Sequence, residues 1–133
     1  MALEFGLWRV ADGAPRRLQS GGVPLESQLE TYIETDPSLL GERLMLIGRQ
    51  VNTGFGYVDL LAVDSEGDVH VLELKRDRTP REVVAQVIDY GAWAGALDYE
   101  GGTGLFEAYR PGDVFEQAFS EFFGGDPVED LNS

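Results

Sequence analysis

The sequence predicts a single α/β domain in which a central β-sheet is covered by helices on both faces. Residues 57–63 and 69–75 are apolar and β-branched on both alternating faces, a pattern typical of central strands buried from two sides. Amphipathic helical patterns precede and follow these strands, over residues 24–35 and 79–97. The 133 residues, 43% of them hydrophobic, suffice for one packed core.

Two further strand regions lie toward the N-terminus. Residues 4–10 and 15–18 flank an Asp-Gly pair and predict a short hairpin. Residues 43–51 predict a strand, and a glycine-rich turn at 52–56 leads from it into the next strand. The five residues 64–68 supply a second hairpin connection.

The amphipathic helices carry their own boundary signals. Asp36-Pro37 ends the first helix, because proline disfavours helical backbone in the residue before it. Thr79 and Glu82 form a capping box at the start of the second helix, with Pro80 at its first position.

The C-terminal part, residues 98–133, is predicted to add a loop, a short strand, a helix and a tail. Three glycines between residues 101 and 104 predict the loop, and residues 105–109 the strand. A helix opening at Asp113 has an apolar stripe that either docks on the core or covers another domain. The stripe consists of Phe115, Ala118, Phe119, Phe122 and Phe123. The acidic tail from Gly124 is expected to fray.

Composition excludes several classes of site. The absence of cysteine excludes disulfides and thiolate metal ligands, and leaves oxygen-ligated metals open. The N-terminus lacks a basic n-region, and no stretch approaches the length of a membrane span. We therefore expect a cytoplasmic protein with no membrane contact.

The net charge of −14 argues against attraction of nucleic acid to the whole surface, because phosphate binding depends on Lys and Arg. The acidic excess is uneven, since residues 98–133 hold nine acidic residues and one basic residue. Four of the ten basic residues fall within seven positions and predict a local basic patch. They are Lys75, Arg76, Arg78 and Arg81.

Two carboxylates are predicted to face each other on the central hairpin. If Val63 pairs with Val69, Asp59 lies directly opposite Glu73. Opposed like charges on a buried sheet are destabilising, so the pair requires compensation. A divalent cation supplies it, since Mg²⁺ prefers oxygen ligands.

Lys75 shares the face of Glu73 and is the only lysine of the chain. An ammonium group can orient or deprotonate water, or stabilise charge developing on a phosphate. The alternative is a plain ion pair between Lys75 and Glu73 at a strand end.

Each helix adds a polar pair at a spacing of four residues. Gln86 and Tyr90 either line a site or mark the solvent boundary of their helix. On the first helix, Glu26 could reach the metal site directly or through water, whereas Glu30 and Glu34 fit an exposed acidic face.

Taken together, these residues resemble the PD-(D/E)XK nuclease superfamily and, within it, the NucS-like (RecB-like) endonuclease branch. The segments that carry the resemblance are LESQLE at 25–30, DP at 36–37, GYVDLL at 56–61 and ELKR at 73–76. The resemblance extends over residues 24–95 and implies a restriction-endonuclease-like core, with a central mixed sheet flanked by helices.

The resemblance also implies a metal centre. Asp59 and Glu73 would hold Mg²⁺ or Mn²⁺, together with the backbone carbonyl of Leu74 and with Glu26, which would act through water or directly. Lys75 would stand beside the attacking water.

Further residues would serve the substrate. Gln86 and Tyr90 would line the same cleft and position the water, Lys75 or the phosphate. Arg76, Arg78 and Arg81 are candidates for contacts to the nucleic-acid backbone, which position a strand without reading its sequence.

The expected function is metal-dependent endonucleolytic hydrolysis of DNA, single-stranded, branched or mismatched, in repair or defence. The weaker alternative is RNA or another phosphodiester substrate. NucS-like enzymes carry a separate DNA-binding domain, and nothing in this chain is long or basic enough to be one. The chain is therefore expected to be one domain of a longer protein, to act with a DNA-binding partner, or to be a relic. A homodimer could cut two strands. The rival is a non-catalytic module of the same fold, whose acidic surface and phenylalanine-rich helix face a protein partner.

Overall fold

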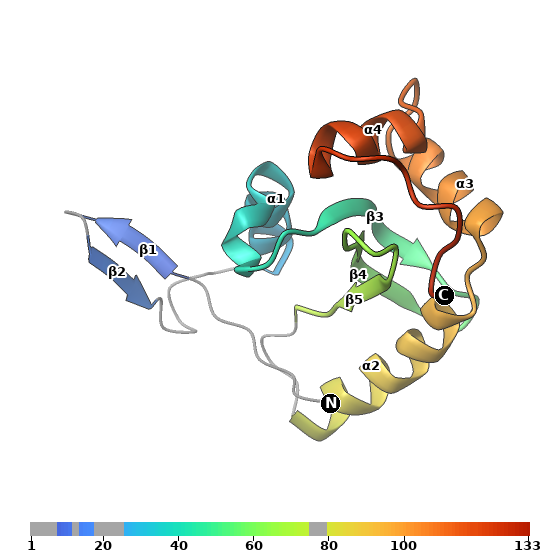
Figure 1. Ribbon diagram of the computed structural model, residues 1–133. Helices are drawn as coiled ribbons and strands as arrows, with labels where there is room; N and C mark the ends of the chain where they lie inside the picture. Colours follow the sequence, from blue (N-terminus) through green and yellow to red (C-terminus); the bar gives the residue numbers. More distant parts are fainter. Residues whose placement is uncertain (1–7, 12–13, 18–25, 75–79) are drawn as a thin grey trace.

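The computed structural model describes residues 8–11, 14–17, 26–74 and 80–133. A three-stranded sheet with the order β3-β4-β5 lies at its centre, with four α-helices around it (Figure 1). The strands are β3 (Met45–Asn52), β4 (Tyr57–Val63) and β5 (Val69–Leu72). The helices are α1 (Glu26–Thr35), α2 (Pro80–Gly95), α3 (Tyr99–Tyr109) and α4 (Phe115–Phe123), with a 3-10 helix, η2 (Pro37–Leu40), after α1.

The α/β class is confirmed, but the expected mixed sheet is wrong for the described residues. Both pairings in the central sheet are antiparallel. Parallel neighbours need a crossover connection of about a dozen residues, whereas short turns link these strands. The predicted N-terminal hairpin is also present, as β1 (Trp8–Ala11) and β2 (Ala14–Arg17).

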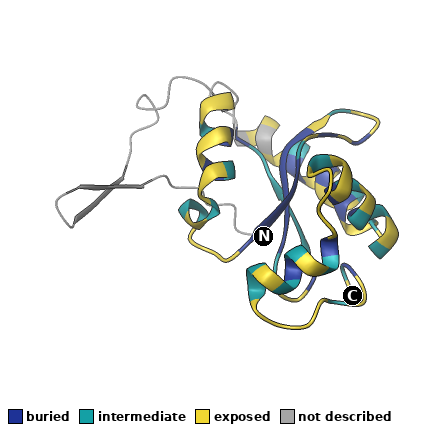
Figure 2. Cartoon of the chain, turned by 90° about the horizontal axis from the view of Figure 1, so that it is seen from above, coloured by how far each residue is buried: buried dark blue, intermediate teal, exposed yellow. Residues whose placement is uncertain are grey.

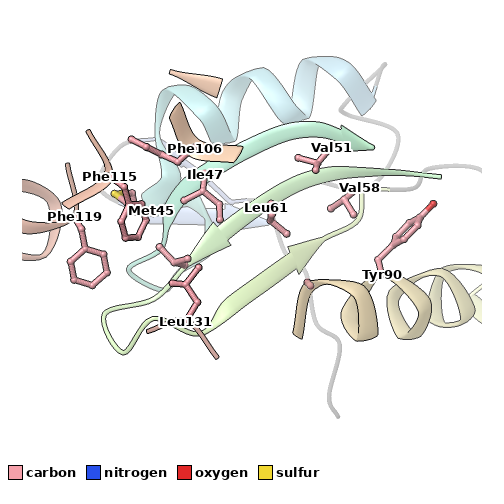
Figure 3. Packing of buried hydrophobic residues seen from close by; sticks show 12 residues of the cluster. Met45, Ile47, Val51, Val58, Leu61, Tyr90, Phe106, Phe115, Phe119 and Leu131 are labelled. Atoms are coloured by element: carbon pink, nitrogen blue, oxygen red, sulfur yellow. The ribbon is translucent and has the colours of Figure 1, made fainter. Parts of the chain in front are cut away.

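Apolar residues cover both faces of the sheet, as predicted. Strands β3 and β4 are largely buried, whereas β5 is partly exposed (Figure 2). On one face, Ile33 of α1 packs into a cluster with Leu44, Leu46, Leu60, Ala62 and Leu74. On the other face, α2 and the aromatic residues of α3 and α4 pack on the sheet (Figure 3). The residues of that larger cluster include Met45, Ile47, Val58, Leu61, Val63, Tyr90, Ala94, Phe106, Phe115 and Phe119.

The predicted register of the β4–β5 hairpin is confirmed, with Val63 opposite Val69. Asp64 closes the turn, because its Oδ1 accepts hydrogen bonds from the backbone N–H groups of Glu66 (2.9 Å) and Asp68 (3.0 Å). Gly67 adopts a left-handed backbone with φ of 87°, which favours glycine. The register places Asp59 and Glu73 at matching positions just beyond the paired residues.

The loop and strand expected at residues 101–109 are wrong, because α3 runs through all three glycines. Asp98 caps this helix by accepting a hydrogen bond from the Gly101 N–H at 2.7 Å. At Gly102, an added Cβ would lie 2.1 Å from Leu131 Cδ1. The helix therefore packs closely on the C-terminal segment at Gly102, and a larger residue there would displace the end of the Leu131 side chain.

The tail was expected to fray, and this expectation is also wrong. Leu131 is buried at 6% exposure. Asn132 Nδ2 donates hydrogen bonds to the carbonyls of Ala94 (2.9 Å) and Leu97 (3.2 Å), and its Oδ1 accepts one from the Val69 N–H (3.0 Å). The end of the chain thus joins β5 to the end of α2.

The last helix docks on the core, as the first of its two alternatives predicted. Phe115 is fully buried and Phe119 is 2% exposed. The centroids of their rings lie 5.8 Å apart, and the ring of Phe115 also packs edge to face on that of Phe106. Within the described part of the chain, no helix is long and apolar enough to cross a membrane.

Candidate active site

The candidate site begins where β4 and β5 separate. Their backbone pairing ends at Leu60 and Leu72. One step further, the Asp59 N–H donates a hydrogen bond to Glu73 Oε1 at 3.2 Å, and the Leu74 N–H donates one to Asp59 Oδ2 at 2.8 Å. Each carboxylate therefore accepts a hydrogen bond from a backbone N–H group across the hairpin, in place of a carbonyl group of the β-ladder.

This arrangement holds Asp59 in a fixed orientation. Asp59 is only 4% exposed, and a buried carboxylate is stable only with partners. Its second oxygen, Oδ1, accepts a hydrogen bond from Gln50 Nε2 at 3.1 Å. Both oxygens of Asp59 are thus held by hydrogen bonds, one from Gln50 of β3 and one from Leu74, which follows β5.

Gln50 links Asp59 to α1. Its Nε2 also donates to Glu30 Oε1 at 2.5 Å, so one amide group serves carboxylates from two elements. In the β3–β4 ladder, Gln50 lies between the pairs Arg49 with Leu60 and Val51 with Val58, which puts it across from Asp59. Its φ of 51° is left-handed, which is rare for a residue other than glycine.

Glu30 was expected on an exposed acidic face, and this expectation is wrong. Glu30 is 4% exposed, because it lies beside Ile33 on the buried side of α1. Arg49 forms an ion pair with Glu30, with 3.6 Å between Nη2 and Oε2. It also pairs with Glu34, with 3.2 Å between Nη1 and Oε1. Glu34, which is half-buried, also accepts a hydrogen bond from the Tyr109 hydroxyl.

This network raises the pKa of Tyr109 to about 12. Burial of the hydroxyl is the largest cause, and the hydrogen bond and negative charge of Glu34 add to it. Tyr109 therefore stays protonated and keeps donating to Glu34 at neutral pH.

Helix α2 carries Gln86 and Tyr90. Tyr90 is 7% exposed and lies near Val58, at the start of β4 (Figure 3). An added Cβ at Gly56 would lie 2.2 Å from the Tyr90 hydroxyl oxygen, so the turn before β4 closes directly over this ring. Gln86 Oε1 is buried and has no hydrogen-bond partner among the described residues.

A groove opens beside these two residues. It has a volume of about 690 Å³. Its lining consists of Phe55, Gln86, Asp89, Tyr90, Ala92 and Trp93. Phe55 is 70% exposed, which is unusual for a phenylalanine and leaves its ring available to a ligand.

Several predicted site residues are not placed. Lys75, Arg76 and Arg78 lie outside the described residues, as does the side chain of Glu26, the first residue of α1. Arg81 is exposed in the first turn of α2. Among the side chains that the structure describes, no group of three or more acidic or histidine residues is arranged to hold a metal ion.

The structure places Asp59 beside Glu73, as the predicted register requires, and adds Gln50 and Glu30, which sequence reasoning missed. Glu30 had a signal, because it lies three residues before the buried Ile33 and therefore on the same side of the helix. Gln50 had none, because a register shift between Leu46 and Gly48 changes which residue of β3 opposes Asp59.

Known proteins match the same part of the chain. A family model described as the endonuclease NucS C-terminal domain matches residues 25–93. Endonuclease NucS of Frankia alni is 32% identical over 95 residues, which is 57% of this chain and 43% of that protein. Endonuclease NucS of Pyrococcus furiosus is 35% identical over 65 residues, 49% of this chain and 24% of that protein. The chain thus spans less than half the length of these curated relatives, and no solved structure matches it significantly.

Proposed function

Because the chain belongs to the endonuclease NucS C-terminal domain family, we propose that it is a metal-dependent nuclease domain of the PD-(D/E)XK type, with a restriction-endonuclease-like core, that hydrolyses DNA phosphodiester bonds. The observation that carries the proposal is the pair of carboxylates, Asp59 and Glu73, held at the end of the sheet by the backbone N–H groups of Leu74 and Asp59 respectively. Two acidic groups kept this close favour a function that uses a cation.

The residues fit Mg²⁺ or Mn²⁺. Asp59 and Glu73 would offer carboxylate oxygens and Leu74 its backbone carbonyl, which are the oxygen ligands that these ions prefer. Glu26 at the start of α1 would contribute directly or through water. When bound, the ion would act as a Lewis acid on the scissile phosphate and make water a better nucleophile.

The chain's own groups supply the rest of the reaction. Lys75 would accept a proton from the attacking water or stabilise the charge that develops on the phosphate. Gln86 and Tyr90 would position that water or the phosphate, and the uncommitted Oε1 of Gln86 supplies an acceptor for this purpose. Contacts of Arg76, Arg78 and Arg81 with the phosphate backbone would fix the position of the strand.

The negative net charge of this chain weakens DNA binding, so another domain or protein would have to supply affinity. A net charge of −14 repels phosphate over most of the surface. The curated relatives are more than twice the length of the matched region. A further DNA-binding domain or partner protein would supply affinity, and a homodimer would place two sites on one duplex.

The rival proposal is a non-catalytic module that binds a protein. Its acidic surface remains an observation in its favour. Its phenylalanine-rich face does not, since Phe115 and Phe119 of α4 are buried in the core of the same chain.

Cleavage assays separate the two proposals. Labelled single-stranded, duplex and mismatched DNA would be incubated with the chain in Mg²⁺, Mn²⁺ or chelator, beside Asp59→Asn and Lys75→Ala. We expect cuts that require metal and disappear in both variants. A folded chain that binds Mn²⁺ in calorimetry but cuts none of these DNAs would favour a missing DNA-binding part. A folded chain that does not bind Mn²⁺ would overturn the nuclease proposal.

A further inference from the structure

Gln50 has a backbone conformation that its residue type does not favour. Among the described residues, only Gln50 (φ 51°) and Asn132 (φ 57°) combine a side chain with a left-handed φ. Asparagine adopts this region several-fold more often than most residues, whereas glutamine gains no comparable local hydrogen bond. Such strain persists only where the surroundings enforce it, and it concentrates at functional sites.

The strained residue lies inside β3 and not at a turn. A left-handed residue breaks the alternation of a strand, so its side chain leaves the direction that its neighbours set. The side chain of Gln50 lies between α1 and β4, and its amide bonds to Glu30 Oε1 at 2.5 Å and to Asp59 Oδ1 at 3.1 Å. The two N–H groups of one amide suffice for both acceptors.

The amide is the one described side chain that donates hydrogen bonds to both carboxylates. Glu30 and Asp59 are each 4% exposed, so water offers them little compensation. With Leu74 N–H on Asp59 Oδ2 and Gln50 Nε2 on Oδ1, hydrogen bonds from two directions fix the orientation of the carboxylate. Such an arrangement presents a ligand to a cation in one orientation.

We propose that Gln50 is a positioning residue of the nuclease site: its strained backbone holds the amide between Asp59 and Glu30 and thereby orients Asp59 toward the metal. This inference rests on the function proposed above. Groups that orient a metal ligand typically change metal affinity by about 10- to 100-fold when they are removed.

Two substitutions separate positioning from a merely structural role. Gln50→Gly removes the amide and relieves the left-handed backbone, whereas Gln50→Ala removes the amide and keeps the strain. Gln50→Gly is therefore expected to have the higher melting temperature of the two. Positioning predicts that both variants nevertheless bind Mn²⁺ about 10- to 100-fold more weakly than the unmodified chain.

The experiment is Mn²⁺ titration calorimetry with thermal unfolding on the full chain, using Gln117→Ala on the exposed face of α4 as the matched glutamine control. We expect the control to bind like the unmodified chain. Unchanged affinity in Gln50→Gly, or affinity that follows melting temperature between the two variants, would overturn the positioning role alone. An unmodified chain that is folded but binds no Mn²⁺ would overturn the proposed function and this inference together.

Discussion

Asp59 and Glu73 hold each other through the backbone: the Asp59 N–H donates to Glu73 Oε1, and the amide next to Glu73, that of Leu74, donates to Asp59 Oδ2. Two carboxylates at the end of a buried hairpin would otherwise repel each other. Hydrogen bonds from backbone N–H groups offset part of that repulsion before any cation binds, because they favour the charged form. The pair is therefore part of the fold as well as of the proposed site.

Asp59→Ala is expected to destabilise the fold, because it leaves the buried Leu74 N–H without its partner. Such a loss costs about 1–3 kcal/mol. Asp59→Asn keeps an oxygen that can accept this hydrogen bond but turns its NH2 group toward Gln50 Nε2, so it should lose less stability than Asp59→Ala while also losing metal affinity. Urea unfolding and Mn²⁺ titration of both variants would check this. Equal stability of the two variants would show that the Leu74 bond does not matter.

Gly102→Ala should loosen the C-terminal segment. The new Cβ would lie 2.1 Å from Leu131 Cδ1, and overpacking of this kind costs about 1–3 kcal/mol. Gly104 lies on the same helix with nothing within 4 Å of an added Cβ. Gly104→Ala should instead stabilise by about 0.5–1 kcal/mol, because alanine is the better helix former. Opposite shifts in melting temperature are the expected result, and shifts of the same sign would contradict it.

Acid should weaken the β4–β5 turn through Asp64. Burial by itself raises the pKa of Asp64, but hydrogen bonds from His70 and from the Asp68 and Glu66 N–H groups outweigh it and hold the pKa below the usual 3.8. A carboxyl with a lower pKa in the folded chain contributes stability above the unfolded value of 3.8 and loses it as the pH falls through the folded value. The free energy of unfolding, measured at a series of acidic pH values, should therefore fall less steeply with falling pH in Asp64→Asn than in the unmodified chain. An unchanged pH dependence would refute this role.

Phe55→Ala is expected to weaken DNA binding without loss of stability, if the proposed function holds. The ring is 70% exposed beside the groove that Gln86 and Tyr90 line. Stacking of one base on an aromatic side chain contributes about 1–3 kcal/mol. Fluorescence anisotropy with single-stranded DNA at low salt would measure the loss. Val114→Ala, at an exposed apolar position before α4, serves as the control, and equal effects in both variants would argue against stacking.

Local patterns predicted much of the central fold. The β4–β5 register followed from the length of one turn, and that register places Asp59 opposite Glu73. Helices α1, α2 and α4 followed from apolar spacing, which reports directly which face of a helix is buried. These features depend on neighbours within a few residues along the chain.

Other features depended on contacts between distant segments. The glycines of α3 resemble a loop, and only the packing of Leu131 against Gly102 explains why the helix continues through them. Gln50 joins the site through a register shift in β3, which has no local signal. Glu30 lies on the apolar side of α1, but only the docking of that helix brings it to Gln50.

The sequence by itself determined the two hairpins, helices α1, α2 and α4, the β4–β5 register and the pair of carboxylates, because turn length and side-chain periodicity are local properties. Only the tertiary structure decided that Glu30 is buried, that Gln50 holds it to Asp59, and that the tail is docked. Those outcomes arise from close packing and hydrogen bonding between segments far apart in the chain, which override the preferences of single residues.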